Sequence, residues 1–361
     1  MNKLIFLIFK TKITFLRPKK AEIMLYDQGV HFNYLFIKSF KNITFEIFYK
    51  RLEKINFYIL FYTILKSGLK NLKFNYLLHY IDKVNPKIII TNNDVDTTFY
   101  KLKKNIKNTI KTISIQRSFK EKNEFNHFKL QKIKYSSDYL LLFSLEQKKY
   151  FKKYIDSKFI VIGSCINNFY KKKIQKENQI IFISEFIKKN LNKSKFFHEK
   201  KILIFLLKYC EKKKIKLKIL LKNLSGYDYN DKKDNISIKI YRKYFDFVKS
   251  KNIISQSRNK TNYDYLDSNK LAIFMDSNLG VETISRDNKT LRIPSIKIKN
   301  KIDPFFGKIE YDLHALTTYS KFENKLNLMI NKNNKKFNFN KLLYHQENNK
   351  TLKRIINQII L

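Results

Sequence analysis

The sequence contains very little cysteine. Its 361 residues include only Cys165 and Cys210, too few for a disulfide framework. Neither lies in a CxxC motif or in a Cys/His cluster of the kind that binds zinc. The simplest expectation is therefore a protein of a reducing compartment.

The chain also lacks long apolar runs. The apolar run INFYILFYTIL at 55–65 is about half of the roughly 20 residues that a bilayer span requires. The apolar stretch LIFLIF at 4–9 is shorter than the roughly 7 to 15 residues of a signal-peptide core. We therefore expect a cytoplasmic protein without a transmembrane segment.

Acidic residues are scarce, with 30 Asp and Glu against 75 Lys and Arg and a net charge of +45. Such a surface attracts polyanions. However, only eight of the basic residues are Arg, whose planar guanidinium group dominates specific recognition of bases and phosphates. The excess of Lys accompanies Asn, Ile, Phe and Tyr, which all have A/T-rich codons, so genome composition explains much of it. We therefore expect no specific nucleic-acid partner.

Lysine-rich runs are compatible with peripheral contact with an anionic membrane as a secondary property. Each lysine close to anionic head groups contributes about 1 kcal/mol of binding free energy. The runs KKYFKK at 148–153 and YKKKIQK at 170–176 could act in this way. The alternative is that they form a solvated helix face or a linker. The first interpretation places the protein on the inner face of the plasma membrane.

Short apolar runs alternate with segments of helical periodicity along the whole chain. Continuous apolar strands that alternate with helices indicate parallel sheets covered on both faces. The fold class that this pattern predicts is α/β, with doubly wound Rossmann-type domains. The predicted strands of the first half are 23–27, 87–91, 111–116, 138–143 and 158–163; those of the second half are 180–184, 216–221, a weak strand at 236–241, 253–255, 271–275 and 290–295.

The pattern breaks once, which divides the chain into two domains. The polar, basic stretch NNFYKKKIQKENQ follows the strand that ends at Gly163, and apolar periodicity then resumes. A chain of this length with 43% hydrophobic residues can form two cores. We predict an N-terminal domain at 1–165, a linker at 166–178, a C-terminal domain at 179–335 and a closing amphipathic helix at 336–361.

The stretch LAIFMDSNLGVETISRDNKTLRIPS at 271–295 reads as strand, tight turn, helix and strand. Ligands of parallel sheets bind beyond the carboxyl ends of the strands, where turns lead into helix N-termini. The strand would deliver Asp276, Ser277 and Asn278 to this edge, and Gly280 would let a ligand approach the backbone. Glu282 could accept hydrogen bonds from ribose hydroxyls, and the helix N-terminus favours phosphate. The turn is therefore a candidate nucleotide site; the alternative is an ordinary turn before a well-capped helix.

The order of these motifs resembles the family of surface carbohydrate biosynthesis proteins, which are GT-B-like proteins of bacterial polysaccharide loci. The resemblance spans about 17–310. It rests on IMLYDQG, NPKIIITNND, ISIQ, DYLLLF, IVIGSCINN, IFISEF and MDSNLGVETISR, of which IGSxxNN and DSxLGxExxxR are the most specific. Two segments depart from the family pattern: IQRSFK at 115–120 and FFGKIEY at 305–311.

The resemblance implies a C-terminal domain that holds a nucleotide-sugar donor, an N-terminal domain that holds an acceptor, and reaction in the cleft between them. It places Asp276, Ser277, Gly280, Glu282 and Arg286 on the donor side. Arg258, which precedes this stretch, could bind the donor diphosphate through its guanidinium or could pair with a nearby Asp.

An inverting transferase needs a base to take the proton of an acceptor hydroxyl. Asp94, which follows the strand at 87–91, is the preferred candidate, and Asp27, which follows the first strand, is the second. The alternatives are that Asp94 caps the helix that begins near Thr97 and that Asp27 belongs to a simple turn. The other acceptor-side candidates are Gly29, His31, Gln116 and Arg117.

No Walker loop, HExxH zinc motif or G-x-S-x-G elbow occurs in the sequence. We expect no metal and no cofactor other than the nucleotide-sugar substrate. The predicted function is a glycosyltransferase of surface polysaccharide synthesis with a carbohydrate or lipid-linked acceptor. The alternatives are a polyol-phosphate transferase, a nucleotide-sugar epimerase on the same fold, or a non-catalytic protein that binds polyanions or acts in assembly.

Overall fold

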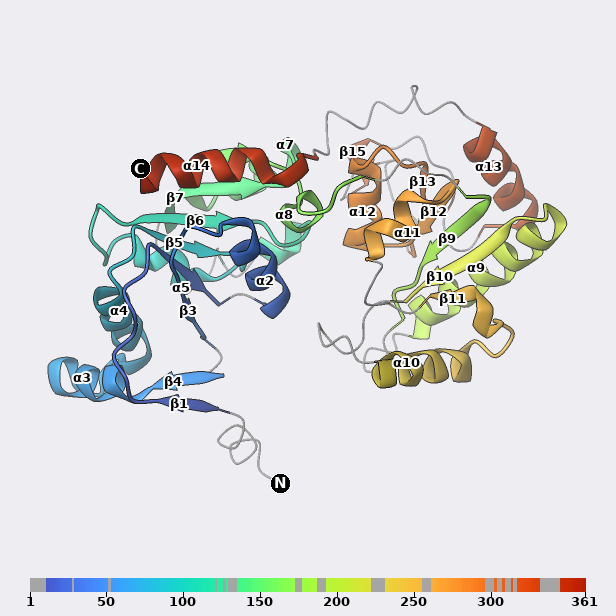
Figure 1. Ribbon diagram of the computed structural model, residues 1–361. Helices are drawn as coiled ribbons and strands as arrows, with labels where there is room; N and C mark the ends of the chain where they lie inside the picture. The colour runs from blue at the N-terminus through green and yellow to red at the C-terminus, as the bar shows by residue number, and fades with distance from the viewer. Residues whose placement is uncertain are drawn as a thin grey trace. The chain divides into compact units, whose positions relative to one another are not determined.

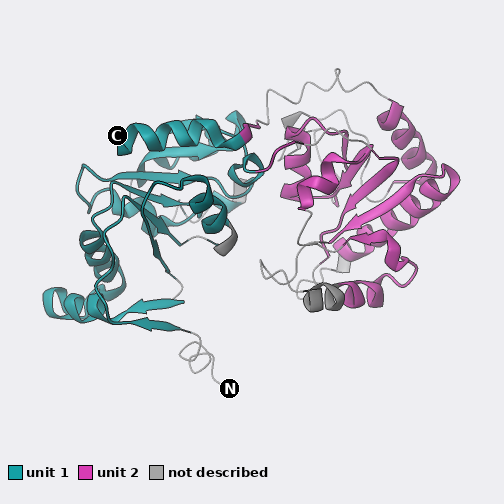
Figure 2. Cartoon of the chain, viewed as in Figure 1, with its two compact units in different colours: residues 1–169, 348–361 teal, residues 170–347 magenta. Residues whose placement is uncertain are grey.

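The chain divides into two compact units, one of residues 1–169 and 348–361 and one of residues 170–347 (Figure 2). The computed structural model describes residues 11–27, 29–50, 53–120, 122–125, 128, 135–172, 177–186, 193–221, 231–254, 261–295, 302–303, 307–308, 313, 317–331 and 345–361. The first crossing between the units falls after Phe169, within the predicted linker at 166–178.

Unit 1 is built on a parallel six-stranded sheet of order β3-β2-β5-β6-β7-β8 (Figure 1). Its elements are β1 (Lys12–Thr14), β2 (Ile23–Tyr26), α2 (Val30–Ser39), β3 (Phe45–Phe48), β4 (Lys54–Asn56), α3 (Phe57–Ser67), α4 (Leu72–Val84), β5 (Ile88–Thr91), α5 (Thr97–Leu102), β6 (Lys111–Ile115), η1 (Lys122–Phe125), β7 (Tyr135–Leu142), α7 (Leu145–Phe151), β8 (Ile155–Val161), α8 (Cys165–Asn168), η7 (Glu347–Asn349) and α14 (Lys350–Ile360).

Alternate residues of the unit 1 strands enter two different cores, as expected for a sheet that is covered on both faces. Met24, Tyr26 and Ile89 pack with α4, α5 and α7. Ile23 and Ile88 pack on the other face, with α2 and the closing helix α14. Of the amphipathic helix predicted at 336–361, residues 350–360 form α14, which covers the sheet of unit 1. Residues 345–349 are not part of this helix, because 347–349 form the turn η7, and residues 336–344 lie outside the described residues.

Unit 2 is built on a parallel five-stranded sheet of order β11-β10-β9-β12-β13. Its elements are β9 (Gln179–Ile183), α9 (Lys193–Lys212), β10 (Lys216–Leu220), α10 (Asp231–Tyr244), η3 (Ser250–Asn252), β11 (Ile253–Ile254), α11 (Asn262–Asp267), β12 (Leu271–Phe274), α12 (Asn278–Ser285), β13 (Thr290–Arg292), β14 (Ile302–Asp303), β15 (Gly307–Lys308) and α13 (Tyr319–Asn331). Helices α9, α10 and α13 form one core with the sheet.

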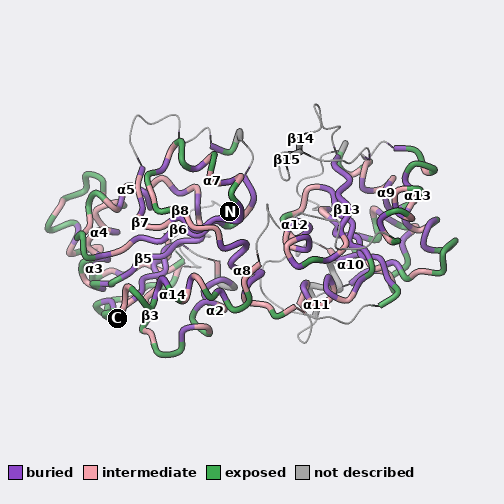
Figure 3. The backbone as a smooth tube through the Cα atoms, turned by 90° about the horizontal axis from the view of Figure 1, so that it is seen from above, coloured by how far each residue is buried: buried purple, intermediate pink, exposed green. Residues whose placement is uncertain are grey.

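Both units are doubly wound α/β domains, which confirms the predicted fold class. The strands β2, β5, β9 and β12 at the centres of the two sheets are buried throughout, whereas the edge strands β3 and β8 are mostly half-buried; Figure 3 shows the burial along the backbone. The weak strand expected at 236–241 is wrong, because these residues belong to α10. Ile238, Tyr241 and Phe245 have helical spacing and all pack in the core of unit 2, so tertiary packing outweighs the β-propensity of the isoleucines.

Within the described parts of the chain, no helix is long and apolar enough to cross a membrane.

Candidate functional site

Each sheet has one position where its strand order reverses. In unit 1 this topological switch lies between β2 and β5, and in unit 2 it lies between β9 and β12. Chains leave the sheet in opposite directions at such a point, which opens a crevice at the carboxyl ends of the strands. The residues that follow these four strands are therefore the first candidates for ligand contact.

The switch point of unit 2 contains Asp276 and Glu185. Asp276 follows β12 and Glu185 follows β9, and the backbone N–H of Asp276 donates to Oε1 of Glu185 at 2.5 Å. The Asp276 carboxylate accepts from Nη2 of Arg292 at 2.7 Å and from Oγ of Ser295 at 3.0 Å. Arg292 of β13 and Ser295 after it therefore both bind the Asp276 carboxylate, while Glu185 after β9 holds the Asp276 backbone.

Cations surround Asp276. The Lys195 ammonium, on the first turn of α9, lies 3.3 Å from its carboxylate and 3.9 Å from that of Glu185. Burial alone would raise the pKa of Asp276, but the hydrogen bond and charge of Arg292, together with Lys195, hold it below its ordinary value. Asp276 is thus a stable anion. The side chain of Lys195 is 46% exposed and so is available to a solvent-borne ligand as well.

A buried carboxylate, Glu199, fixes the loop after β9. It accepts from the hydroxyls of Ser184 at 2.5 Å and Tyr241 at 3.1 Å, and from the backbone N–H of Glu185 at 3.2 Å. Burial raises the pKa of Glu199 to about 7, although these hydrogen bonds oppose the shift. Glu199 therefore holds Glu185 in place, and Glu185 in turn holds the Asp276 backbone.

The helix α12 begins directly after this cluster, with Ser277 as its N-cap and Asn278 exposed at its first position. The Ser277 side chain makes no capping hydrogen bond within this described helix. Gly280 is buried, and a Cβ atom there would overlap the ring of Phe274. The expectation that Gly280 admits a ligand is corrected: glycine is needed because α12 packs closely on β12.

Glu282 accepts a hydrogen bond from the hydroxyl of Tyr263 at 2.8 Å and is half-buried. Tyr263 is buried, and its ring lies 4.7 Å from that of Tyr170. Glu282 thus lies one helical turn beyond Asn278, as its spacing predicts, and its position is fixed by a tyrosine from α11.

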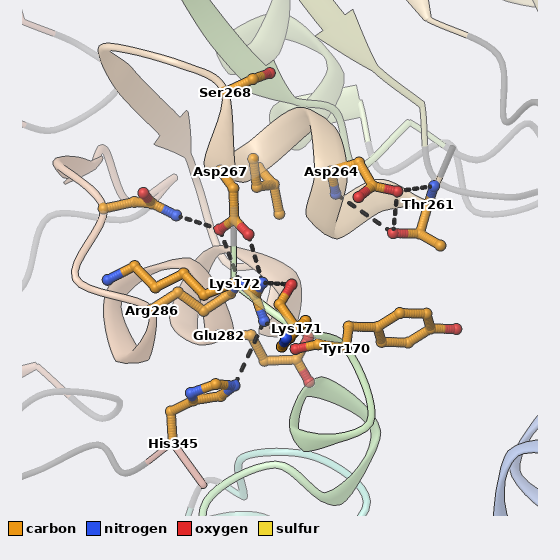
Figure 4. Close-up of polar contacts among 12 residues, drawn as sticks. Tyr170, Lys171, Lys172, Thr261, Asp264, Asp267, Ser268, Glu282, Arg286 and His345 are labelled. Atoms are coloured by element: carbon orange, nitrogen blue, oxygen red, sulfur yellow. Dashed lines mark hydrogen bonds and ion pairs between the residues drawn. The ribbon is translucent and has the colours of Figure 1, made fainter. Parts of the chain in front are cut away.

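Arg286, which was expected on the donor side, is an internal anchor (Figure 4). Its side chain is fully buried and forms a two-pronged ion pair with Asp267. It also donates to the backbone carbonyls of Tyr170 at 3.1 Å and Lys171 at 2.9 Å, and contacts Nε2 of His345 at 3.5 Å. These partners occupy the guanidinium group, so its observed role is structural, and the donor-side expectation is corrected.

The anchor joins α12 to both segments of unit 2 that lead to unit 1. Tyr170 and Lys171 open unit 2, and His345 lies just before its end at Glu347. Burial, and then the charge of Arg286, lowers the pKa of His345, which favours a neutral ring at this position. Arg258, the other expected donor ligand, lies outside the described residues.

The switch point of unit 1 contains Asp27, after β2, and Asn93 and Asp94, after β5. Asp27 adopts a left-handed backbone conformation, with φ of 45°, and its carboxylate accepts from Nδ2 of Asn93 at 3.3 Å. Non-glycine residues rarely adopt this conformation, and Asp and Asn tolerate it best. Asp27 and the segment after β5 are therefore held together across the switch point.

Asp94 is 1% exposed. Its Oδ1 accepts from the backbone N–H of Arg117 at 3.2 Å and lies 3.8 Å from the ammonium of Lys120. Its Oδ2 is buried and accepts no hydrogen bond from any described residue. Burial raises the pKa of Asp94 to about 6, although Lys120 and the Arg117 N–H oppose the shift.

Asp96, not Asp94, caps the following helix. Its carboxylate accepts from the backbone N–H of Thr98 at 2.9 Å and pairs with Lys50 at 2.5 Å. The alternative that Asp94 is a helix cap is therefore wrong. Asp94 and Asp96 thus have different partners and different surroundings.

The remaining acceptor-side candidates are Gln116, Arg117, Gly29 and His31, which differ in burial and in their contacts. Gln116 is buried, donates to Gln147 at 2.6 Å and accepts from the backbone N–H of Phe143 at 2.9 Å, so its amide organises the loops after β6 and β7. The side chain of Arg117 is exposed. Gly29 is the N-cap of α2. The side chain of His31 lies outside the described residues.

Sequence reasoning missed Glu185, Lys195, Glu199 and Arg292 in unit 2, and Lys50 and Lys120 in unit 1. Glu185 follows an apolar strand as directly as Asp276 does, so the same rule could have found it. In the part of the chain that the structure describes, no group of three or more His, Cys, Asp or Glu residues could hold a metal ion.

Two Rossmann-like units of this kind define the GT-B fold, and solved structures share it. One is UDP-GlcNAc 2-epimerase of Methanocaldococcus jannaschii in complex with UDP-GlcNAc and UDP, with 15% identity, a TM-score of 0.50, and 96% of this chain and 100% of that chain covered. Another is a variant of the wall teichoic acid polymerase TagF, with 12% identity, a TM-score of 0.50, and 94% and 89% covered.

Residues 112–308, more than half of the chain, match the sequence model of a family described as putative O-antigen biosynthesis protein. The chain belongs to this family, which confirms the resemblance to surface carbohydrate biosynthesis proteins. No curated protein sequence matches the chain significantly.

Proposed function

We propose that this protein is a glycosyltransferase that uses a nucleotide-sugar donor in the synthesis of a surface polysaccharide. The observation that carries the proposal is the cation-lined switch point of unit 2, where Lys195 and Arg292 surround Asp276 beside the N-terminus of α12. Membership of the O-antigen biosynthesis family and the GT-B fold support the pathway and the scaffold.

The donor diphosphate would bind at the start of α12. A helix N-terminus presents backbone N–H groups and a partial positive charge, which together favour a phosphate group. The ammonium of Lys195, which is 46% exposed and lies 3.3 Å from the Asp276 carboxylate, is close enough to the switch point to contact a phosphate there. The exposed Asn278 and the carboxylate of Glu282 lie on the same helix and would contact the nucleoside.

Unit 1 would supply the acceptor side, with Asp94 as the preferred general base and Asp27 as the second candidate. A carboxyl group with a pKa near 6 is mostly ionised at neutral pH, yet it is a stronger base than an ordinary aspartate. Its buried Oδ2, which accepts no hydrogen bond from the described residues, could take a proton from an acceptor hydroxyl. Arg117 and Gly29 would contact a carbohydrate or lipid-linked acceptor.

A nucleotide-sugar epimerase is the second candidate function. The specific observation in its favour is the similarity over nearly the whole length of both chains to a UDP-GlcNAc 2-epimerase. An epimerase changes one sugar nucleotide without an acceptor, whereas a transferase releases free nucleotide only when an acceptor is present. A polyol-phosphate transferase would share the donor site but would use a different nucleotide-linked group.

The first test is nucleotide binding, measured by thermal shift with UDP, CDP, GDP and CMP at physiological ionic strength. A ligand that binds only the folded state raises the melting temperature, so one nucleotide should shift the wild type selectively. Lys195→Ala should weaken this shift. Lys208→Ala is the matched control, because this exposed lysine lies on the same helix about 20 Å further along.

Glu282→Gln tests the nucleoside contact in the same assay, since the amide keeps an acceptor for the Tyr263 hydroxyl. We expect a weaker thermal shift with an unchanged melting temperature of the free protein. If no nucleotide shifts a wild-type protein that melts cooperatively, the transferase and epimerase proposals both fail, and a non-catalytic assembly protein becomes the better account.

A further inference from the structure

Unit 1 exposes an apolar surface that no part of the proposed transferase site uses. It is formed by β1, the segment that follows it, and α3. Large side chains there face solvent: Phe15 is 69% exposed, Leu16 84%, Phe61 59%, Leu65 86% and Leu69 73%. Ile13, Tyr58 and Ile64 extend the same surface. We call these eight residues the apolar platform. Figure 1 shows α3, β1 and β4 together at one end of unit 1.

The platform is held in place by strand pairing, hydrogen bonds and ring packing. β1 pairs in parallel with β4, and β4 continues directly into α3. Asn56 caps α3 by accepting from the backbone N–H of Ile59 at 3.1 Å, and its amide donates to the carbonyl of Leu16 at 2.8 Å. Phe15 and Phe57 pack ring against ring at 5.4 Å. These contacts hold the exposed residues of β1 and α3 on one surface.

Helix α3 is apolar on opposite faces. Ile59 and Thr63 are buried, four residues apart on the face that packs within unit 1. Tyr58, Phe61 and Leu65 follow the i, i+3, i+7 pattern, which places them on one stripe, and this stripe is exposed. A helix that is apolar on both faces normally has a partner on each. In the described structure the partner of the outer stripe is missing.

The charge around the platform identifies the kind of partner. The two sequence segments that carry it, 11–20 and 54–81, contain no Asp or Glu. They do contain eight basic residues: Lys12, Arg17, Lys19, Lys20, Lys54, Lys66, Lys70 and Lys73. All but Lys54 are exposed. A second copy of the chain bound face to face would bring two such cationic rims together, with only the exposed Glu53 and Asp82 next to these segments in the sequence, which disfavours self-association.

We propose that the apolar platform and its basic rim dock the protein on a bilayer that contains anionic phospholipids. Phe15, Phe61 and Leu65 would enter the interfacial region, where aromatic and apolar side chains are favoured. The lysines would contact the phosphates of the head groups. Helix α3 has 11 residues, too few to span a bilayer, so it lies on the membrane surface. This surface differs from the lysine runs at 148–153 and 170–176.

The docking proposal does not depend on the transferase proposal, because no residue of the platform belongs to either switch point. The two can therefore fail separately. If both hold, docking would bring unit 1 to the membrane surface on which a lipid-linked acceptor resides.

The protein has no tryptophan, so a single introduced tryptophan is a specific reporter. Leu65→Trp should show a blue-shifted emission with phosphatidylcholine vesicles that contain phosphatidylglycerol, because the indole would leave water. Leu328→Trp is the matched control: this leucine is 65% exposed on α13 of unit 2, and its emission should not change. No shift for Leu65→Trp, or equal shifts for both variants, would overturn the proposal.

Vesicle co-sedimentation of the full chain separates the two components of docking. Phe61→Gln combined with Leu65→Gln should lower the partition coefficient at least about tenfold, because apolar burial is lost. Lys66→Gln combined with Lys70→Gln should lower it by about 30-fold, at roughly fivefold per lysine, and only for anionic vesicles. If the apolar variant instead converts a lipid-free dimer to a monomer, the platform is a self-association surface and the membrane proposal is wrong.

Discussion

The two switch points occupy equivalent positions in their sheets, but the pKa of the aspartate at each is shifted in the opposite direction. At the switch point of unit 2, Asp276 lies between Arg292 and Lys195, and its pKa is held below the ordinary value. At the switch point of unit 1, Asp94 has one ammonium at 3.8 Å and a buried oxygen without a hydrogen bond from the described residues. Its pKa is raised to about 6.

This difference shows that topology places a carboxylate but does not determine what it does. A carboxylate that is neutralised by two cations resists protonation and serves to position its neighbours. A carboxylate that is buried with little compensation costs folding free energy and is a stronger base. We therefore propose donor binding at the switch point of unit 2 and proton transfer at that of unit 1.

The largest expected effect is on catalysis by Asp94→Asn. Removal of a general base should lower kcat by about 10²- to 10⁴-fold. The affinity for nucleotide should remain, because the residue lies in unit 1. The measurement is the initial rate of sugar transfer, with the nucleotide sugar that the binding panel identifies. A variant with near wild-type kcat would remove Asp94 from the mechanism and direct attention to Asp27.

Asp94→Asn should lower activity, but it should raise the free energy of unfolding relative to wild type as pH increases. Because the folded-state pKa of Asp94 is raised from 3.8 to about 6, its contribution to stability is full below about pH 4 and is lost as pH rises through 6. Asparagine does not titrate. The free energy of unfolding of Asp94→Asn relative to wild type should therefore rise by about 2 kcal/mol between pH 4 and pH 8 in denaturant titrations. A constant difference would contradict the raised pKa.

The next effect distinguishes the two buried arginines of unit 2. Arg286→Lys breaks the two-pronged pair with the fully buried Asp267 and should cost about 3–5 kcal/mol of stability, without a specific loss of nucleotide affinity. Arg292→Lys should lower both stability and nucleotide affinity, because it disturbs Asp276. Denaturant unfolding and calorimetric titration of both variants provide the comparison. Equal losses of affinity after correction for unfolded protein would contradict the internal role of Arg286.

Gly280→Ala should have a moderate effect that comes from packing alone. The added methyl group overlaps the ring of Phe274, so we expect a loss of about 1–3 kcal/mol. Phe274→Leu in the same chain should restore part of this loss, because the smaller side chain makes room. The free energy of unfolding of the single and double variants tests this. If the losses of the two single variants simply add in the double variant, the Phe274 ring is not the reason that Gly280 is required.

The smallest effect expected is that of Asp96→Ala. The cap of α5 and the pair with Lys50 would be lost, at about 1 kcal/mol of stability. Transfer activity should change little, in contrast to Asp94→Asn two residues earlier. A drop in kcat as large as that of the Asp94 variant would show that the two carboxylates act together.

Much of this arrangement could be predicted from the sequence. Apolar strands followed by polar residues are short-range patterns, and the carboxyl ends of parallel strands always meet at one edge. This is why Asp276, Asp27 and Asp94 could be placed at sheet edges. The start of α12 after Ser277 and the half-buried position of Glu282 follow from the same local spacing.

The partners of these residues could not be predicted, because they depend on long-range packing. Glu199 lies inside a helix, and its contact with Ser184 follows only from the way α9 crosses β9. Arg292 belongs to a strand, where its spacing gives no sign that it reaches Asp276. The requirement for Gly280 comes from the ring of Phe274, and the contacts of Arg286 with Tyr170 and His345 come from chain segments more than 50 residues away.

The most direct test of the comparison is calorimetric titration of the selected nucleotide into Asp276→Asn and Asp94→Asn side by side, at neutral pH. The cooperative melting of each variant first establishes that it is folded. We predict an affinity at least about tenfold weaker than wild type for Asp276→Asn, because the amide no longer holds the Arg292 guanidinium and the Lys195 ammonium in place, and an unchanged affinity for Asp94→Asn. Loss of affinity in the Asp94 variant with retention in the Asp276 variant would contradict the assignment of donor binding to unit 2.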